Sequence, residues 1–151
     1  MTDLTLAIAL PLLGAFLLPV VARGGLRWLG ALLGPGLLLL SALVVFANAS
    51  TYESPYAIAL GGFSPPLGIT FYVDPLALLF ALAIPLTTLM LWPGADDDAG
   101  TRRQSLTLLL AASLTGLALS GDLFNLYVFY ELAAVASYGL AAGSGSSTGF
   151  V

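Results

Sequence analysis

The sequence has 151 residues, of which 59% are hydrophobic and 8% are charged, and its formal net charge is −4. Because soluble domains average about 25% charged residues, this composition predicts a polytopic membrane protein. Cysteine and histidine are both absent, which excludes disulfides, thiolate chemistry and histidine ligation of metals or haem. We therefore expect neither a cofactor nor a metal site in this chain.

Five apolar segments have about the length needed to cross a hydrocarbon core roughly 30 Å thick. They are residues 4–22, 28–47, 74–92, 105–120 and 122–142. The first does not resemble a signal peptide, since Asp3 precedes it and no basic residue does. The predicted fold is all-α, with about five transmembrane helices in one unit, 1–142, followed by a Gly/Ser-rich tail, 143–151.

The connections between these segments carry local signals. Residues 48–73 contain two short apolar runs around the turn-rich GGFSPPLG (61–68), which predicts a hairpin-like loop on the membrane surface. Asp74 followed by Pro75 is typical of a helix start, so Asp74 is predicted to be an N-cap. Residues 93–104 are predicted to form a polar loop. In the fourth span, small residues recur at 112, 116 and 120, a stripe that allows another helix to approach closely.

The arginines predict an orientation for the five spans. Arg23 and Arg27 follow the first span, and Arg102 and Arg103 precede the fourth, so all four fall on the same side. Basic residues concentrate in cytoplasmic loops. The chain is therefore predicted to run N-out and C-in, as a multi-pass protein of the cell membrane.

The fifth span carries one acid near its middle, Glu131, nine residues after Asp122 and thus ~13 Å along a helix. A carboxylate at this depth costs about 2.5–3.5 kcal/mol on insertion scales, so it usually protonates or finds a cation. We interpret Glu131 as a proton carrier. The alternative is a permanently neutral acid hydrogen-bonded to Tyr127, Ser137 or a neighbouring helix. Helical spacing places Tyr127 and Tyr138 on its stripe, which predicts that the acid faces other helices rather than lipid.

Gly121 and Asp122 precede this helix. Glycine ends the fourth helix and aspartate caps the fifth, which explains Asp122 structurally. A role for Asp122 in proton access is the alternative.

A family resemblance covers roughly residues 55–142. The segment SGDLFNLYVFYELAAVASYGL (120–140) resembles the fifth-helix signature of D-type subunits of Mrp multisubunit Na⁺/H⁺ antiporters. More loosely, it is similar to the antiporter-like membrane subunits of respiratory complex I and of membrane-bound hydrogenases. GGFSPPLGITFYVDPLALLF (61–80) resembles the stretch leading into the third helix of the same group.

The resemblance implies that Glu131 matches the family's fifth-helix glutamate, which pairs with a lysine on a later helix and takes part in proton translocation. This sequence has no lysine, and it ends near the expected start of a sixth helix. The resemblance thus implies the N-terminal portion of such a subunit: a fragment, a frameshift product or one half of a split subunit.

Three functions stay open at this point. The first is a transport subunit, not an enzyme, of a cation/proton antiporter, with H⁺ and Na⁺ as ions and other membrane subunits as partners. The second is a subunit of an oxidoreductase's membrane arm, whose redox cofactors would lie on other subunits. The third is a non-transporting assembly protein or remnant.

Overall fold

The computed structural model describes residues 3–23, 27–60, 68–94 and 98–143. Over these residues the chain forms five α-helices and one two-stranded sheet. In chain order they are α1 (Leu6–Arg23), α2 (Arg27–Ser50), β1 (Tyr56–Ala59), β2 (Thr70–Val73), α3 (Pro75–Met90), α4 (Asp98–Leu119) and α5 (Leu123–Gly143).

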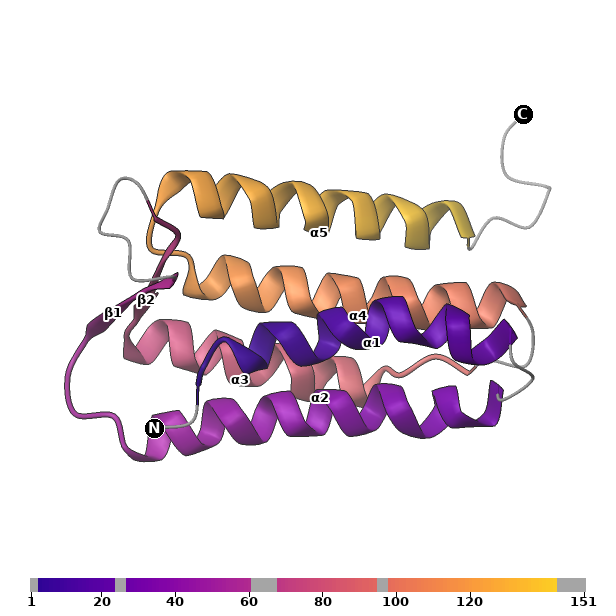
Figure 1. The fold of residues 1–151 in the computed structure, drawn as a ribbon, viewed down its shortest axis with the longest axis horizontal. Coiled ribbons are helices and arrows are strands. Elements are labelled where there is room, and N and C mark those ends of the chain that lie inside the picture. Colours follow the sequence, from indigo (N-terminus) through magenta and orange to yellow (C-terminus); the bar gives the residue numbers. More distant parts are fainter. Residues whose placement is uncertain (1–2, 24–26, 61–67, 95–97, 144–151) are drawn as a thin grey trace.

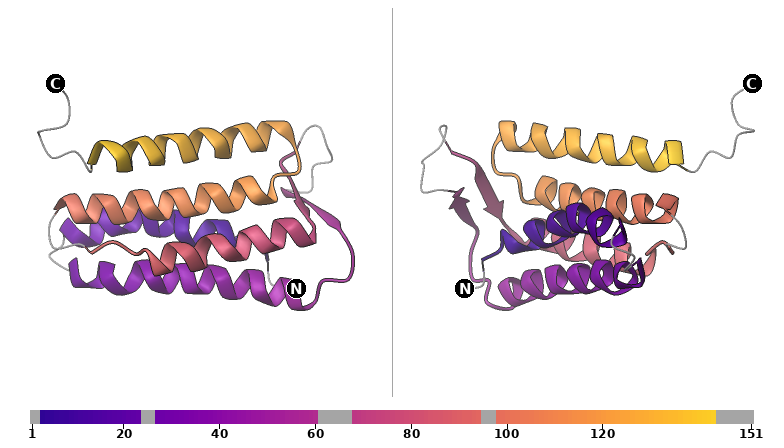
Figure 2. Two further views of the ribbon diagram at one scale, coloured as in Figure 1. Left: turned by 180° about the vertical axis from the view of Figure 1, so that it is seen from behind. Right: turned by 45° about the vertical axis from the view of Figure 1, so that its right-hand side comes forward.

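The helices lie side by side with their long axes nearly aligned, and α4 occupies the middle of the bundle (Figure 1). It packs against α1 and α3 on one side and against α5 on the other, while α2 closes the far side. The two views in Figure 2 show the same layers from behind and from an oblique direction. Because α5 packs extensively only on α4, most of its circumference has no neighbour within the described chain.

Small side chains bring the inner helices together. Ala7, Ala81 and Ala112 are buried in the core of the half nearer the hairpin. There the hydroxyl of Ser41 donates to the carbonyl of Ala7 at 2.7 Å and so satisfies a buried polar group between α1 and α2. The other half of the core is built around Leu18, Leu38 and Leu108. Large apolar side chains cover the outside of the bundle, as expected for a surface that meets lipid.

Within the residues that the structure describes, three helices are long and apolar enough to cross a membrane: α1, α2 (from Trp28) and α5. The helix α3 is apolar but only 16 residues long. The first turns of α4 carry Arg102, Arg103 and Gln104, which lower its hydropathy. The first, second and fifth segments therefore match the expected spans by length and composition, whereas the third and fourth helices fall short of that criterion.

The predicted loop at 93–104 is partly wrong, because α4 begins at Asp98, seven residues before the predicted start at 105. Arginine and glutamine are good helix formers, so a polar composition does not prevent a helix here. Gln104 is only 1% exposed, and its amide donates to the carbonyl of Pro93 at 2.9 Å. That bond holds the backbone of Pro93, shortly after α3, next to α4.

The hairpin between α2 and α3 agrees with the prediction. The strands β1 and β2 pair antiparallel, with Tyr56 opposite Val73 and Ala59 opposite Thr70; the turn-rich segment between them lies outside the described residues. The buried residues of β2 are Thr70, Phe71 and Val73, while Tyr72 faces outward. The hairpin therefore rests on one end of the bundle through β2.

Candidate functional site on the fifth helix

The start of α5 is fixed by Asp122, which uses both carboxylate oxygens. Oδ1 accepts from the backbone amide of Asn125 at 2.7 Å, the N-cap contact expected from the sequence. Oδ2 accepts from the backbone amide of Thr70 in β2, also at 2.7 Å. The amide of Gly121 donates to the carbonyl of Thr70 at 2.8 Å, so three hydrogen bonds hold the hairpin, the α4–α5 turn and the start of α5 together.

Two glycines decide which face of α5 meets α4. A Cβ on Gly116 of α4 would collide with the ring of Phe129, so this glycine makes room for the α5 aromatic. In the reverse direction, a Cβ on Gly139 would lie 2.9 Å from Leu106 of α4. The small-residue stripe predicted in the fourth span therefore does admit a neighbouring helix at Gly116, with Phe129 filling the space.

The contact with α4 buries Asn125, Ala133 and Ala136 and turns the opposite side of α5 outward. Glu131 lies on this outward side and is exposed. Tyr127 is 60% exposed and Tyr138 is 75% exposed. The predicted stripe of Tyr127, Glu131 and Tyr138 is therefore present. Within the described chain this stripe does not pack against another helix, and the prediction that Glu131 faces other helices stays a prediction. The close α4–α5 packing selects the alanine and glycine face instead.

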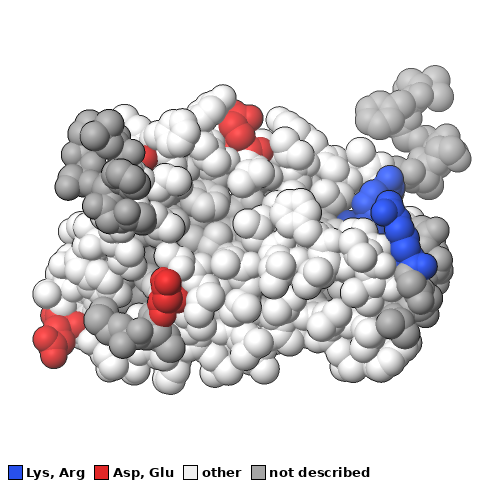
Figure 3. Space-filling model, in the orientation of Figure 1, with Lys and Arg blue, Asp and Glu red and all other residues white. Residues whose placement is uncertain are grey.

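Figure 3 shows how the charges are distributed over the bundle. Basic side chains gather at one end, and acidic ones lie at the hairpin end and along the edge formed by α5. In the part of the chain that the structure describes, no hydrogen bond joins Glu131 to Tyr127 or Ser137; the Ser137 hydroxyl instead donates to the carbonyl of Ala133 at 2.7 Å. No group of three or more metal-ligating side chains occurs among the described residues. Glu131 is thus a single carboxyl group presented midway along an open helix face.

Sequence reasoning did not single out Thr70 or Asn125. Asn125 is 3% exposed, and its side-chain amide nitrogen has no hydrogen-bond partner in the described structure; the hydroxyl of buried Thr70 is in the same situation. Thr70 lies beside Asp122 only because the hairpin folds onto the start of α5, whereas Asn125 is held there by the N-cap of its own helix. The position of Asn125, three residues after the N-cap, was the one local signal available.

Two other titratable groups at the hairpin end have shifted pKa values. Hydrogen bonds from the Thr5 hydroxyl and the Thr5 amide lower the pKa of Asp3, which precedes α1. Desolvation, followed by the charge of Asp74, raises the pKa of Tyr52. Neither group belongs to α5, so neither acts directly on Glu131.

Comparisons with known proteins identify relatives of this bundle. No protein-family model matches the chain. It is 37% identical to the D-type subunit of a probable K⁺/H⁺ antiporter of Rhizobium meliloti over 91% of this chain. It is 36% identical to the D-type subunit of the Na⁺/H⁺ antiporter of Bacillus subtilis over 54% of this chain. Its fold superposes on a chain of the Mrp complex from Dietzia sp. with a TM-score of 0.79 and 30% identity, covering 92% of this chain.

The chain is homologous to antiporter D-type subunits. These relatives are longer: the chain spans 27% of the Rhizobium protein, 17% of the Bacillus protein and 27% of the Dietzia chain. The homology extends to respiratory complexes. The N-type subunit of the NADH-quinone oxidoreductase of Desulforudis audaxviator is 35% identical over 71% of this chain and 23% of its own length. A chain of the membrane-bound sulfane sulfur reductase, an archaeal respiratory membrane complex, matches with a TM-score of 0.83 and 31% identity over 97% of this chain and 31% of that one.

Proposed function

We propose that this chain acts as a membrane subunit of a multisubunit monovalent cation/proton antiporter, in which Glu131 carries protons. The D-type homologues support the antiporter assignment. The observation that carries the role of Glu131 is its position: the acid is exposed midway along α5, on the side turned away from α4. In a bilayer this position is costly unless another protein segment covers it.

The open face of α5 is the proposed contact with that segment. A carboxylate next to a cation stays ionised, and withdrawal of the cation raises its affinity for a proton. The family resemblance assigns the cation to a lysine on a later helix, and this chain contains no lysine. A basic residue on another segment would therefore cover Glu131 and control its protonation, while Tyr127 lies one turn away on the same face.

Five spans with an N-out and C-in orientation belong to the same proposal, as does a multi-pass location in the cell membrane. The support comes from the placement of the described arginines Arg23, Arg102 and Arg103, since the bundle brings the basic side chains to one end (Figure 3). That end would face the cytoplasm. Asp122 and the hairpin would then lie at the outer surface. Their contacts account for Asp122 as an anchor of α5, which favours the structural role over proton access.

Substitution of Glu131 tests the carrier role. Glu131→Gln keeps the size and hydrogen-bonding capacity of the side chain but cannot exchange a proton, so antiport by the assembled complex should be lost. Glu131→Asp keeps a titratable group with shorter reach and should retain partial activity with a shifted pH optimum. The measurement is cation-dependent proton flux in inverted vesicles, normalised to the amount of assembled complex.

The matched control is Glu53→Gln, which removes an exposed acid outside the helices and should leave flux unchanged. Wild-type flux in Glu131→Gln would rule out the carrier role. If Glu131 is instead a permanently neutral, hydrogen-bonded acid, Glu131→Gln should be tolerated and Glu131→Asp should reduce flux more than Glu131→Gln does.

A second candidate function is a proton-translocating role in the membrane arm of an oxidoreductase. It is favoured by the similarity to the Desulforudis oxidoreductase protein and to the archaeal sulfane sulfur reductase. Purification of the tagged chain from its native membranes separates the two candidates. Flavin and iron–sulfur absorbance in the purified complex would support the oxidoreductase, and a complex made only of membrane subunits would support the antiporter.

A further inference from the structure

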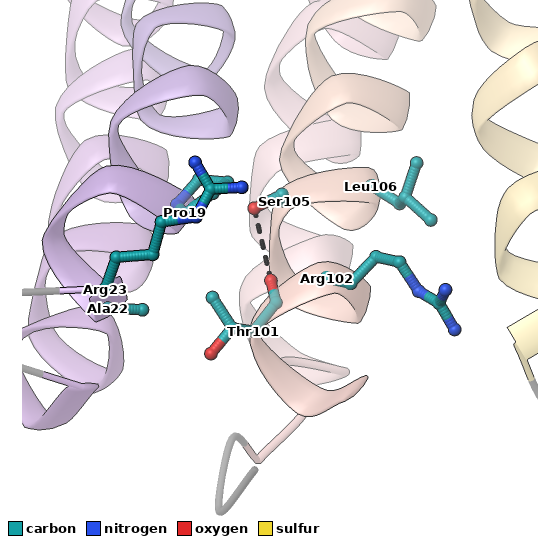
Figure 4. A pocket seen from close by; sticks show the side chains of 7 residues that line it. All are labelled: Pro19, Ala22, Arg23, Thr101, Arg102, Ser105 and Leu106. Carbon is teal, nitrogen blue, oxygen red and sulfur yellow. Dashed lines mark hydrogen bonds between the residues drawn. The ribbon is translucent and has the colours of Figure 1, made fainter. Parts of the chain in front are cut away.

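A cavity of about 420 Å³ opens between the C-terminal end of α1 and the N-terminal part of α4. In Figure 4, α1 contributes one wall and α4 the other. We call it the α1/α4 cavity, and its lining consists of Pro19, Ala22, Arg23, Thr101, Arg102, Ser105 and Leu106. It lies at the opposite end of the bundle from the hairpin and does not include Glu131.

The lining of this cavity suits an anion. Arg23 and Arg102 come from two different helices, and none of the lining residues that the structure describes is acidic. Across the described residues, no carboxylate forms an ion pair with either arginine. A guanidinium group is always charged, and its fork of N–H donors matches the oxygens of a phosphate.

The direction of Arg23 supports a ligand within the cavity. Figure 4 shows the Arg23 side chain turned back along α1 toward the level of Ser105, rather than away from the helix end. An arginine near a helix end ordinarily extends toward water. Arg102 lines the cavity from α4, and its guanidinium group points toward α5 in the same view.

The apolar part of the lining distinguishes a lipid from a free anion. Pro19, Ala22 and Leu106 add an apolar wall to the charged and hydroxyl groups. A lipid headgroup with its glycerol and acyl chain would contact both kinds of surface, whereas inorganic phosphate would use only the polar part. Basic pockets between transmembrane helices on the cytoplasmic side bind anionic headgroups in this way.

We propose that the α1/α4 cavity binds the phosphate group of an anionic phospholipid, with Arg23 as the main contact and Arg102 as the second. The acyl chain lies against Pro19 and Leu106. The site is separate from Glu131 and does not depend on the proposed transport role. Asp96, Asp97 and Asp98 precede Arg102 in the sequence, and their side chains lie outside the described residues.

Native mass spectrometry of the chain released from nanodiscs tests this site. The nanodiscs contain equal amounts of phosphatidylglycerol and phosphatidylcholine, and the ratio of retained lipids is measured. The wild-type chain should retain phosphatidylglycerol in preference, and Arg23→Gln should reduce this preference about fivefold, as expected for one arginine near the membrane surface. Arg102→Gln should act in the same direction.

The matched control is Arg103→Gln, which removes the same charge from the next residue, outside the cavity lining. It should keep the wild-type preference, as should the combined change of Asp96, Asp97 and Asp98 to asparagine. Equal losses in the Arg23 and Arg103 variants would overturn the proposal, since they would indicate general attraction to a basic end.

Two further arms separate the remaining outcomes. Inorganic phosphate is added to the chain in phosphatidylcholine nanodiscs; retention of phosphate, without any preference for phosphatidylglycerol, would overturn the lipid assignment. If Arg23→Gln loses helical circular dichroism, a photo-crosslinker replacing Leu106 in the otherwise unchanged chain gives the answer instead. Crosslinks to phosphatidylglycerol in excess of phosphatidylcholine support the proposal, and equal crosslinking of both lipids overturns it.

Discussion

At the scale of single residues, Asp122 connects two parts of the chain that are far apart in sequence. One carboxylate oxygen caps α5, and the other binds the backbone of β2, so the hairpin and the helix share one anchor. Asp74 offers a natural comparison, because among the described residues its carboxylate caps α3 through the amide of Ala77 at 2.7 Å and accepts no second hydrogen bond.

The two aspartates should therefore differ in their contribution to stability. Loss of an N-cap costs about 1 kcal/mol, and loss of a hydrogen bond to a charged group costs about 1.5–3 kcal/mol. Asp122→Ala should lower the melting temperature clearly more than Asp74→Ala, measured by circular dichroism of the detergent-solubilised protein. Asp122→Asn, which can still cap, should fall between Asp122→Ala and the wild type. Equal shifts for the two alanine variants would mean that the bond to β2 contributes nothing.

At the scale of elements, the contact between α4 and α5 depends on the missing side chain of Gly116. The ring of Phe129 occupies the space that a Cβ would need, and the same ring lies near Phe71 of β2, with centroids 6.3 Å apart. Phe129 therefore joins three elements, and within the described chain α4 is the one helix on which α5 packs extensively.

Gly116→Ala should destabilise the α4–α5 contact even though alanine favours a helix over glycine by about 1 kcal/mol. Gly36 in α2 is the matched control, because a Cβ there meets no atom within 4 Å. Gly36→Ala should leave the melting temperature unchanged or raise it, whereas Gly116→Ala should lower it. Combining Gly116→Ala with Phe129→Ala should remove most of the additional loss, since the clash disappears; a fully additive double variant would contradict this account.

Signals that act within a few residues were enough to predict several elements. The hairpin strands, the caps at Asp74 and Asp122 and the small residue at 116 were all readable locally, because turn chemistry and capping require particular side chains. The start of α4 could not be predicted from local sequence. Its polar residues are typical of a loop by composition, yet their intrinsic propensity favours a helix. The outward direction of Glu131 depends on which face of α5 packs on α4. Helical spacing shows which residues share a face of α5, but it does not show which face another helix packs against.

At the scale of the whole molecule, the number of membrane crossings depends on whether α3 and α4 cross the bilayer. Composition and length favour α1, α2 and α5 as spans, while α3 is short and α4 begins with polar residues. The bundle nevertheless packs α4 between α5 and the other helices. This position supports the proposed five spans, because a helix packed between spanning helices and parallel to them would cross the bilayer with them.

The proposed topology can be tested by labelling single cysteines, because the natural chain contains none. Thr51 is exposed at the hairpin end and Ala99 is exposed in the first turn of α4. With five spans, Thr51→Cys should react with a membrane-impermeant maleimide only from outside, and Ala99→Cys only from the cytoplasm. Val135→Cys, on the exposed side of α5, is the control and should react only after solubilisation.

If α3 and α4 did not cross, both Thr51→Cys and Ala99→Cys would react from the same side. An exchange of the two sides would instead preserve five spans and reverse the orientation, so that Glu131 would lie on a helix entering from the cytoplasm.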